Sequence, residues 1–154
     1  MTFRVQEEHL REAQDDATLV SLREQEDLGL DLLTDGEQRR THFIHHVLAS
    51  WEGLDTVNFH PKAIRGSTTV ERLVPRVVGR IKRRTQAVVE DLRFAKAHTS
   101  RPVKMAVPGP LTVVDSTYDE AYGNEEALAM DAAAALNEEL LELQAAGCDV
   151  AQID

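Results

Sequence analysis

Helical segments alternate with short apolar runs along this chain, and this alternation is the feature that most constrains its fold. Four apolar runs have the length of buried strands, and they lie at residues 30–33, 75–81, 102–107 and 148–154. Helices that alternate with such runs are typical of parallel βαβ units. The sequence therefore predicts an α/β fold with parallel strands.

Five helical segments are expected, at residues 1–14, 15–28, 43–51, 81–98 and 124–147. The last is the clearest, because Asn124 is a favourable helix cap and Gly147 a favourable helix stop. Asp15 and Asp16 suit the start of the second segment, and Gly29 suits the position just after its end.

Residues 51–75 lose helical period, and we expect a long irregular connection there, of a kind that is rarely idle in a compact domain. The helix expected after it begins with the basic residues Arg80, Lys82, Arg83 and Arg84. This basic cluster has two interpretations, because it could hold the anionic tail of a ligand or form a solvated helix face.

Polar residues follow two of the expected strands directly. The turn Thr34-Asp35-Gly36 leads into Glu37-Gln38-Arg39-Arg40, and the turn Pro108-Gly109-Pro110 leads towards Asp115, Ser116 and Tyr118. Enzymes of the α/β class keep their chemistry at the carboxyl ends of strands. The alternative is a solvated turn whose acids favour the start of a helix.

Two architectures fit a parallel sheet. A doubly wound sheet would carry a glycine-rich phosphate turn, and the sequence has neither that motif nor a Walker motif. A (β/α)8 TIM barrel fits the acids at strand ends but needs about 250 residues. The chain has 154 residues and about four expected strands. We therefore expect residues 1–154 to form one partial barrel domain, roughly half a barrel, truncated at both ends.

Charge and composition narrow the class of protein. A net charge of -10 argues against binding to nucleic acid. No apolar run approaches the roughly 20 residues that span a membrane, and the first ten residues lack the apolar core of a signal peptide. The single cysteine, Cys148, agrees with a reducing compartment. These features predict a cytoplasmic protein without a membrane partner.

Candidate metal ligands are sparse. His42, His45 and His46 lie close together, but no cysteine or acid accompanies them at ligand spacing, so we prefer an ordinary exposed helix face. Cys148, near the start of a strand, is interpreted as a small buried apolar residue. No metal ligand is therefore assigned in this chain.

Three segments together resemble the cobalamin-independent methionine synthase family, including its short members that keep only the catalytic C-terminal barrel. They are residues 29–40 with Asp35-Gly36-Glu37, the turn Pro108-Gly109-Pro110-Leu111-Thr112, and residues 145–154 with Gln152-Ile153-Asp154. In the family the last segment continues into Glu-Pro. The resemblance covers about residues 15–154 and implies the N-terminal half of the barrel.

The resemblance implies a zinc-dependent homocysteine S-methyltransferase that produces methionine. Glu37 and Asp154 match the family's substrate-binding carboxylates, which hold the amino group of the amino acid. The family's zinc ligands lie in the second half of its barrel, so we expect zinc to be bound outside this segment. The chain by itself is then expected to be inactive, and its partners are the remainder of the barrel, or a second chain, and the small-molecule substrates.

The resemblance leaves the methyl donor open. Where the long, folate-using members have a tryptophan that stacks on the pterin, this chain has Ser116, with Asp115 before it and Tyr118 close behind. Either Tyr118 holds the ring of methyltetrahydrofolate in another way, or the donor is a methylated corrinoid or another alkyl donor. These three residues are the possible donor-binding residues.

Two other functions fit the same sequence. One is a related zinc-dependent alkyltransferase that opens epoxides with a thiol lacking an amino group, which would not need Glu37 and Asp154. The other is a non-catalytic half-barrel module that assembles with a partner.

Overall fold

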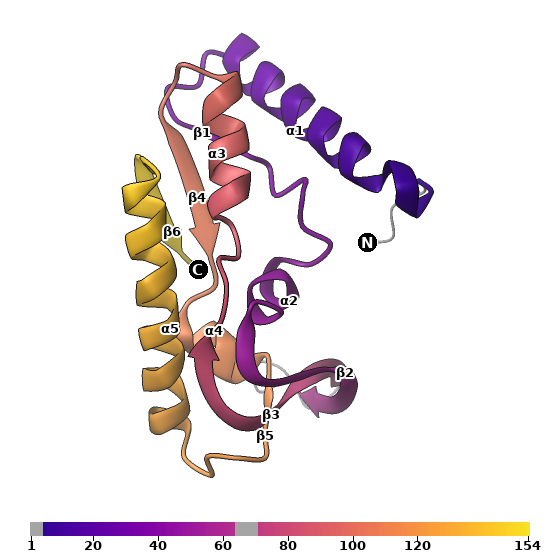
Figure 1. Ribbon diagram of the computed structural model, residues 1–154, viewed down its shortest axis with the longest axis vertical. Coiled ribbons are helices and arrows are strands. Elements are labelled where there is room, and N and C mark those ends of the chain that lie inside the picture. Colours follow the sequence, from indigo (N-terminus) through magenta and orange to yellow (C-terminus); the bar gives the residue numbers. More distant parts are fainter. Residues whose placement is uncertain (1–4, 64–70) are drawn as a thin grey trace.

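A parallel three-stranded sheet and a separate antiparallel hairpin organise the chain (Figure 1). The computed structural model describes residues 5–63 and 71–154. In chain order the elements are a 3-10 turn at Glu7–His9, α1 at Leu10–Asp27, β1 at Leu33–Thr34, α2 at Phe43–Leu48, β2 at Trp51–Ala63, β3 at Glu71–Arg83, α3 at Val89–His98, β4 at Val103–Val107, α4 at Pro110–Asp115, β5 at Tyr118–Asp119, α5 at Glu125–Ala145 and β6 at Val150–Ile153.

The parallel sheet has the strand order β1-β4-β6. Leu33 pairs with Val103 across β1 and β4, and Val107 pairs with Ile153 across β4 and β6. Leu33, Val103 and Val107 are fully buried in the core, as expected for parallel strands covered by helices. The predicted α/β fold with parallel strands is confirmed, but the run predicted as a strand at residues 75–81 lies in β3, which pairs antiparallel with β2 outside this sheet. All three strands run in one direction, so their carboxyl ends share one edge of the sheet.

The chain before β1 differs from the prediction. Instead of two helices with a start at Asp15, a single helix α1 runs through that position. The Asp15 carboxylate accepts a hydrogen bond from Arg39 at 2.7 Å, so it is engaged with a distant loop rather than with a helix cap. Gly29 has a φ of 76° after the helix end, as predicted. The strand is shorter than predicted, because Leu30 and Leu32 are partly exposed and lie outside β1.

The long connection is mostly an antiparallel hairpin, so the prediction of an irregular segment is wrong for the part that the structure describes. Residues 51–63 form β2, which pairs with β3 from Trp51 opposite Arg83 to Ala63 opposite Glu71. Residues 64–70 of the predicted connection lie outside the described residues. The helix predicted to start at residue 81 starts at Val89, because β3 continues to Arg83.

The base of the hairpin is closed at one point. The Ser50 carbonyl accepts the backbone N–H groups of Arg84 and Thr85 at 3.0 and 3.1 Å. The short strand β5 then adds to β3 in parallel, with Arg76 opposite Tyr118. The chain therefore enters and leaves the hairpin at neighbouring positions, between α2 and α3.

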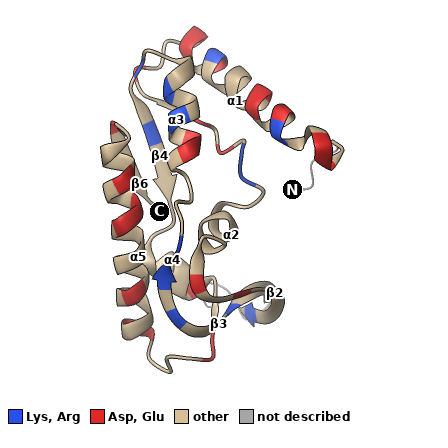
Figure 2. Ribbon diagram, in the orientation of Figure 1, with Lys and Arg blue, Asp and Glu red and all other residues tan. Residues whose placement is uncertain are grey.

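The basic cluster on β3 forms ion pairs with α5. Arg80 pairs with Asp131 at 2.9 Å, and Arg83 lies 2.8 Å from both Glu139 and Glu142. Figure 2 shows basic positions along β3 and acidic positions along the neighbouring α5. The cluster starts on a strand rather than on the predicted helix: Arg83 is nearly buried in its ion pairs, whereas the side chain of Arg80 is 74% exposed and therefore solvated.

Among the helices that the structure describes, none combines the length and apolar character needed to cross a membrane.

Candidate functional site

The two predicted substrate-binding acids follow strands of the parallel sheet. Glu37 lies three residues beyond the end of β1, and Asp154 comes directly after β6. Because β1 and β6 flank β4 in a parallel sheet, both residues belong to its carboxyl-terminal edge. Catalytic groups of parallel α/β folds gather at this edge. The topology thus places two acids that are 117 positions apart in the sequence (154 minus 37) at the same edge of the sheet, on either side of β4.

A tight turn presents Glu37. Gly36 and Glu37 both have positive φ, at 65° and 56°. The Glu37 N–H donates to Asp35 Oδ1 at 3.1 Å, and the Arg40 N–H donates to the Glu37 carbonyl at 3.0 Å. Left-handed backbone costs a residue other than glycine roughly 1–2 kcal/mol. Backbone strain of this kind is retained where the surrounding contacts fix it, and it concentrates at functional sites.

Buried charges lie beneath this turn. Asp35 is fully buried and Arg40 nearly so. Arg40 Nη1 donates to the Ala106 carbonyl on β4 at 2.8 Å, and its Nη2 lies 3.6 Å from Asp35 Oδ2. Within residues 5–63 and 71–154, that carboxylate oxygen and Arg40 Nη2 have no hydrogen-bond partner, so the pair is held by charge attraction. Arg40 therefore connects the turn after β1 to the end of β4.

The neighbouring Arg39 points to other elements. Its guanidinium pairs with Asp15 of α1 at 2.7 Å and with Asp91 of α3 at 3.4 Å. It also lies 4.1 Å from the centre of the Phe94 ring, close enough for a cation–π contact. Arg39 thus joins helices, whereas Arg40 joins strand ends.

The Pro108-Gly109-Pro110 turn holds the backbone of Asp154. The Gly109 N–H and the Thr112 hydroxyl, the latter at 2.8 Å, both donate to the Asp154 carbonyl. A Cβ on Gly109 would lie 3.0 Å from that same carbonyl oxygen, so the close approach favours glycine. Gln152 Nε2 donates to Asp154 Oδ1 at 2.6 Å. Two of the motifs that carried the family resemblance are therefore in direct contact.

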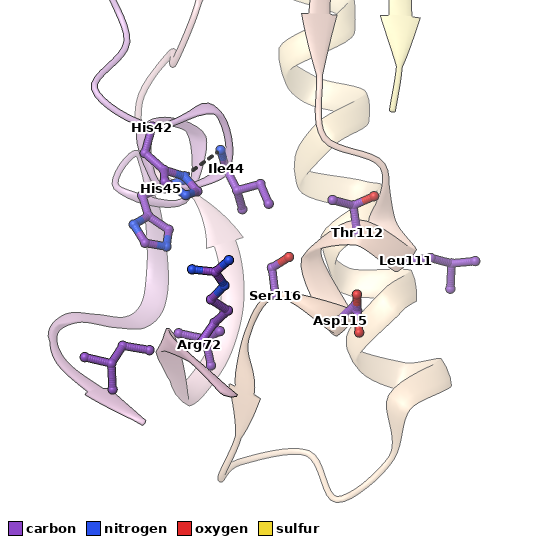
Figure 3. Close-up of a pocket in the computed structure, with 10 residues that line it drawn as sticks. His42, Ile44, His45, Arg72, Leu111, Thr112, Asp115 and Ser116 are labelled. Carbon is purple, nitrogen blue, oxygen red and sulfur yellow. Dashed lines mark hydrogen bonds between the residues drawn. The ribbon is translucent and has the colours of Figure 1, made fainter. Parts of the chain in front are cut away.

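A pocket of about 610 Å³ adjoins this edge and is bounded by α2, β3 and α4. Its polar lining residues are His42, His45, Arg72, Thr112, Asp115 and Ser116. Figure 3 shows the two histidines on one side, the α4 residues on the other, and Arg72 between them. Because Thr112 lines the pocket and also contacts Asp154, the pocket is next to the predicted amino-acid site.

The three possible donor-binding residues separate into two groups. Asp115 and Ser116 line the pocket. Tyr118 is not among the lining residues, and its ring stacks on His60 of β2, with centroids 3.5 Å apart and planes 6° from parallel. The ring of Tyr118 therefore contacts the hairpin and is not part of the pocket lining.

The histidines of α2 have separate roles. His42 Nδ1 accepts the N–H groups of Ile44 and His45 at 3.2 and 3.3 Å and caps the helix, and its ring stacks on His45 at 3.9 Å. Burial lowers the pKa of both His42 and His45. His46 Nε2 lies 3.1 Å from the Ala87 carbonyl. Two neutral imidazoles thus face the pocket at neutral pH.

The residues that the structure describes do not fit a zinc site. In the part of the chain that the structure describes, no group of three or more histidine, cysteine, aspartate or glutamate side chains could hold a metal ion. Cys148 is partly buried against the core, and burial raises the pKa of its thiol. Cys148 therefore has the packing role that the sequence predicted.

The sequence places Arg40 in the polar run after a strand end but predicts no role for it, and it does not predict the two pocket histidines and Arg72 as parts of this region. The pocket histidines were assigned to an exposed helix face. Arg72 belongs to the hairpin, which the sequence did not predict.

A parallel sheet with acids, a buried ion pair and a pocket at its carboxyl-terminal edge defines an α/β barrel type of catalytic domain. Residues 2–154 match the model of the cobalamin-independent synthase catalytic domain, and the chain belongs to that family. The family predicted from the three motifs is confirmed.

Solved structures and curated relatives agree with this assignment. The B12-independent methionine synthase from Shewanella sp. W3-18-1, solved in complex with selenomethionine, is 38% identical with a TM-score of 0.92, over 99% of this chain and 44% of that one. A methionine synthase from Thermococcus kodakarensis is 32% identical over 98% of this chain and 44% of its own length. A Listeria monocytogenes protein at 23% identity, with a TM-score of 0.74, shares the fold. The chain thus spans less than half the length of these relatives.

Proposed function

We propose that this chain is the part of a methionine synthase that binds the amino-acid substrate and forms one wall of the methyl-donor site. In this proposal Glu37 and Asp154 hold the ammonium group of homocysteine at the carboxyl-terminal edge of the parallel sheet. The product of methyl transfer to the homocysteine thiol is methionine. Methionine synthase relatives cover 98% of this chain, which supports the proposed reaction.

The observation that carries the proposal is the convergence of the two acids on one sheet edge. An ammonium group between two carboxylates forms charge-assisted hydrogen bonds, which fix its position better than neutral ones. A substrate held in this way presents its sulfur at a fixed distance, which lowers the entropic part of the barrier. The relative from Shewanella, which was solved with selenomethionine, supports an amino acid of this size as the ligand.

Zinc belongs to the proposal through the family resemblance alone. It would supply a thiolate at neutral pH, because a bound metal lowers the pKa of a thiol. Its ligands would come from outside the described residues, and no step at this edge is assigned to it.

The pocket beside Asp154 is the proposed donor site. Asp115 and Ser116 would contact the donor, and the neutral rings of His42 and His45 offer planar surfaces for an aromatic group. Tyr118 is left out of this site, because it stacks on His60. The donor class, methyltetrahydrofolate or a methylated corrinoid, is decided by measuring which of the two the complete protein demethylates.

The test is Glu37→Gln in the complete protein. We expect the KM for homocysteine to rise about 10- to 100-fold, because a hydrogen bond to a charged group contributes about 1.5–3 kcal/mol. Turnover of 4-mercaptobutanoate, the same thiol without the amino group, should not change. Asp31→Asn is the matched control, since it removes the charge of an exposed carboxylate that lies before β1 and outside the turn.

An unchanged KM for homocysteine in Glu37→Gln would contradict the proposal. Equal use of the two thiols by the parent protein would favour the epoxide-opening alkyltransferase instead. A complete protein that transfers no methyl group from either donor would favour the non-catalytic module.

A further inference from the structure

We propose that the buried Asp35–Arg40 pair is a positioning device that fixes the Glu37 carboxylate at the amino-acid site. The inference rests on the proposed function, since it takes Glu37 as the acid that binds the substrate's ammonium group. It assigns Asp35 and Arg40 a role in selectivity for amino acids, beyond the stability of the fold.

The first step concerns the backbone of the turn. Glu37 adopts a φ of 56°, which side chains other than glycine rarely hold without support. Two contacts supply that support: Asp35 Oδ1 accepts the Glu37 N–H, and the Glu37 carbonyl accepts the Arg40 N–H. The direction of the Glu37 side chain therefore depends on the residues before and after it.

The second step concerns the connection to the sheet. The Arg40 side chain is 1% exposed, and it reaches from the turn to the Ala106 carbonyl on β4 at 2.8 Å. The Asp35 side chain is equally buried, 3.6 Å from the guanidinium. Asp154 is bound to the same strand, because its N–H donates to the Val107 carbonyl at 3.0 Å. The turn that carries Glu37 is thus bonded through Arg40 to Ala106 of β4, and Asp154 is bonded to the adjacent residue Val107.

The third step is a contrast with Arg39. This arginine is also buried and ion-paired, but its partners Asp15 and Asp91 belong to α1 and α3. Within residues 5–63 and 71–154, no hydrogen bond or ion pair joins the Arg39 side chain to Asp35 or to β4. Arg39 is therefore a matched control for the loss of a buried guanidinium in the same loop.

The experiment measures selectivity for the amino group in the complete protein. Binding of L-methionine and of 4-(methylthio)butanoate, which lacks the amino group, is measured by calorimetry. The ratio compared between variants is the Kd for 4-(methylthio)butanoate divided by the Kd for L-methionine. Arg40→Lys keeps the charge but cannot reach both Ala106 and Asp35, so we expect the ratio to fall about tenfold or more. Arg39→Lys should change it by less than about threefold, even where both variants lower the Tm.

A double-mutant cycle separates this inference from the proposed function. In a Glu37→Gln background, Arg40→Lys should lower the ratio no further, because the carboxylate that it positions is gone. If Glu37→Gln alone leaves the ratio unchanged, the proposed function fails. If Glu37→Gln lowers the ratio but Arg40→Lys does not, the positioning role fails while the proposed function stands.

A second variant tests the same inference if Arg40→Lys does not fold. Where Arg40→Lys unfolds below the assay temperature, Asp35→Asn keeps the size and the Oδ1 acceptor but removes the charge that faces Arg40. A lowered ratio in Asp35→Asn supports the inference, and a ratio equal to that of the parent protein overturns it.

Discussion

His42 combines two functions in one imidazole. Its Nδ1 caps α2 by accepting two backbone N–H groups, and its ring lines the pocket. An acceptor nitrogen must be unprotonated, and a positive charge at a helix N-terminus opposes the helix dipole. Burial lowers the pKa of His42, and burial and then the charge of His42 lower the pKa of His45. The folded state therefore favours the neutral forms of both rings.

This preference predicts a pH dependence of stability. Because the folded-state pKa lies below the ordinary value of 6.5, the stabilisation is fully present above pH 6.5 and is lost as the pH falls through the folded-state pKa. We expect the free energy of unfolding, measured with urea, to decrease from about pH 7 to pH 5. His42→Asn keeps a capping acceptor that does not titrate, so its decrease should be smaller. An NMR titration of His42 with a midpoint above 6.5 would contradict this account.

At the scale of elements, the start of α3 depends on a side chain from α5. Glu139 is 1% exposed, and its carboxylate accepts the N–H groups of Ala87 and Val88 at 2.8–3.1 Å. The same carboxylate lies 2.8 Å from Arg83 at the end of β3. One acid therefore accepts the N–H groups of the segment that leads into α3 and pairs with Arg83, so α3, α5 and β3 are stabilised together.

Glu139→Ala should lower the free energy of unfolding by about 2–4 kcal/mol, because it removes one of the two carboxylate partners of Arg83 and leaves two backbone N–H groups without an acceptor. The matched control is Glu138→Ala, one position earlier on the exposed side of α5, which should change stability by less than about 0.5 kcal/mol. Chemical denaturation of both variants checks the difference. Equal losses would mean that the cap and the ion pair contribute little.

The same scale shows which elements the sequence could predict. The strand β4 and the helix α5 were predicted because their local patterns agree with their tertiary surroundings. The hairpin was missed because its pairing shifts register between Glu52 and Leu54 and again between Asp55 and His60. Gly53 lies at the first shift with a φ of 82°, and a Cβ there would be 2.5 Å from the Arg80 carbonyl. Such irregular pairs break the alternation that identifies a strand.

The candidate site was predictable where it follows strand ends and unpredictable where it depends on tertiary contacts. The positions of Glu37 and Asp154 follow from two apolar strands and the parallel topology. The burial of Arg40 does not, because the strand that covers it lies 66 residues away in sequence. The stacking of Tyr118 on His60 likewise depends on the hairpin.

For the whole molecule, the free edge of the parallel sheet is the main feature. β6 pairs with β4 on one side, and Val150 and Ile153 on it are 40% and 59% exposed. Natural proteins rarely leave an apolar edge strand uncovered. Because the chain spans 44% of its methionine synthase relatives, we propose that the remainder of the barrel covers this edge in the complete protein.

Val150→Lys in the complete protein tests this arrangement. We expect the free energy of unfolding to fall by about 3 kcal/mol, because the position would be covered and a charge would be buried there. Val20→Lys is the matched control: Val20 lies on α1 and is 56% exposed, so its replacement should have little effect. Similar effects of the two substitutions, measured by thermal unfolding, would show that β6 stays uncovered.

The closure of the hairpin at Ser50 has a consequence for how such a domain can diversify. Its two strands depart and return within one hydrogen-bonded junction, where the Ser50 carbonyl meets the N–H groups of Arg84 and Thr85. Changes near Arg72, at the end of the hairpin away from this junction, can therefore remodel one wall of the pocket while the strands that carry Glu37 and Asp154 keep their places. Evolution of the hairpin could thus change which molecule the pocket binds without changing the binding of the amino acid at Glu37 and Asp154.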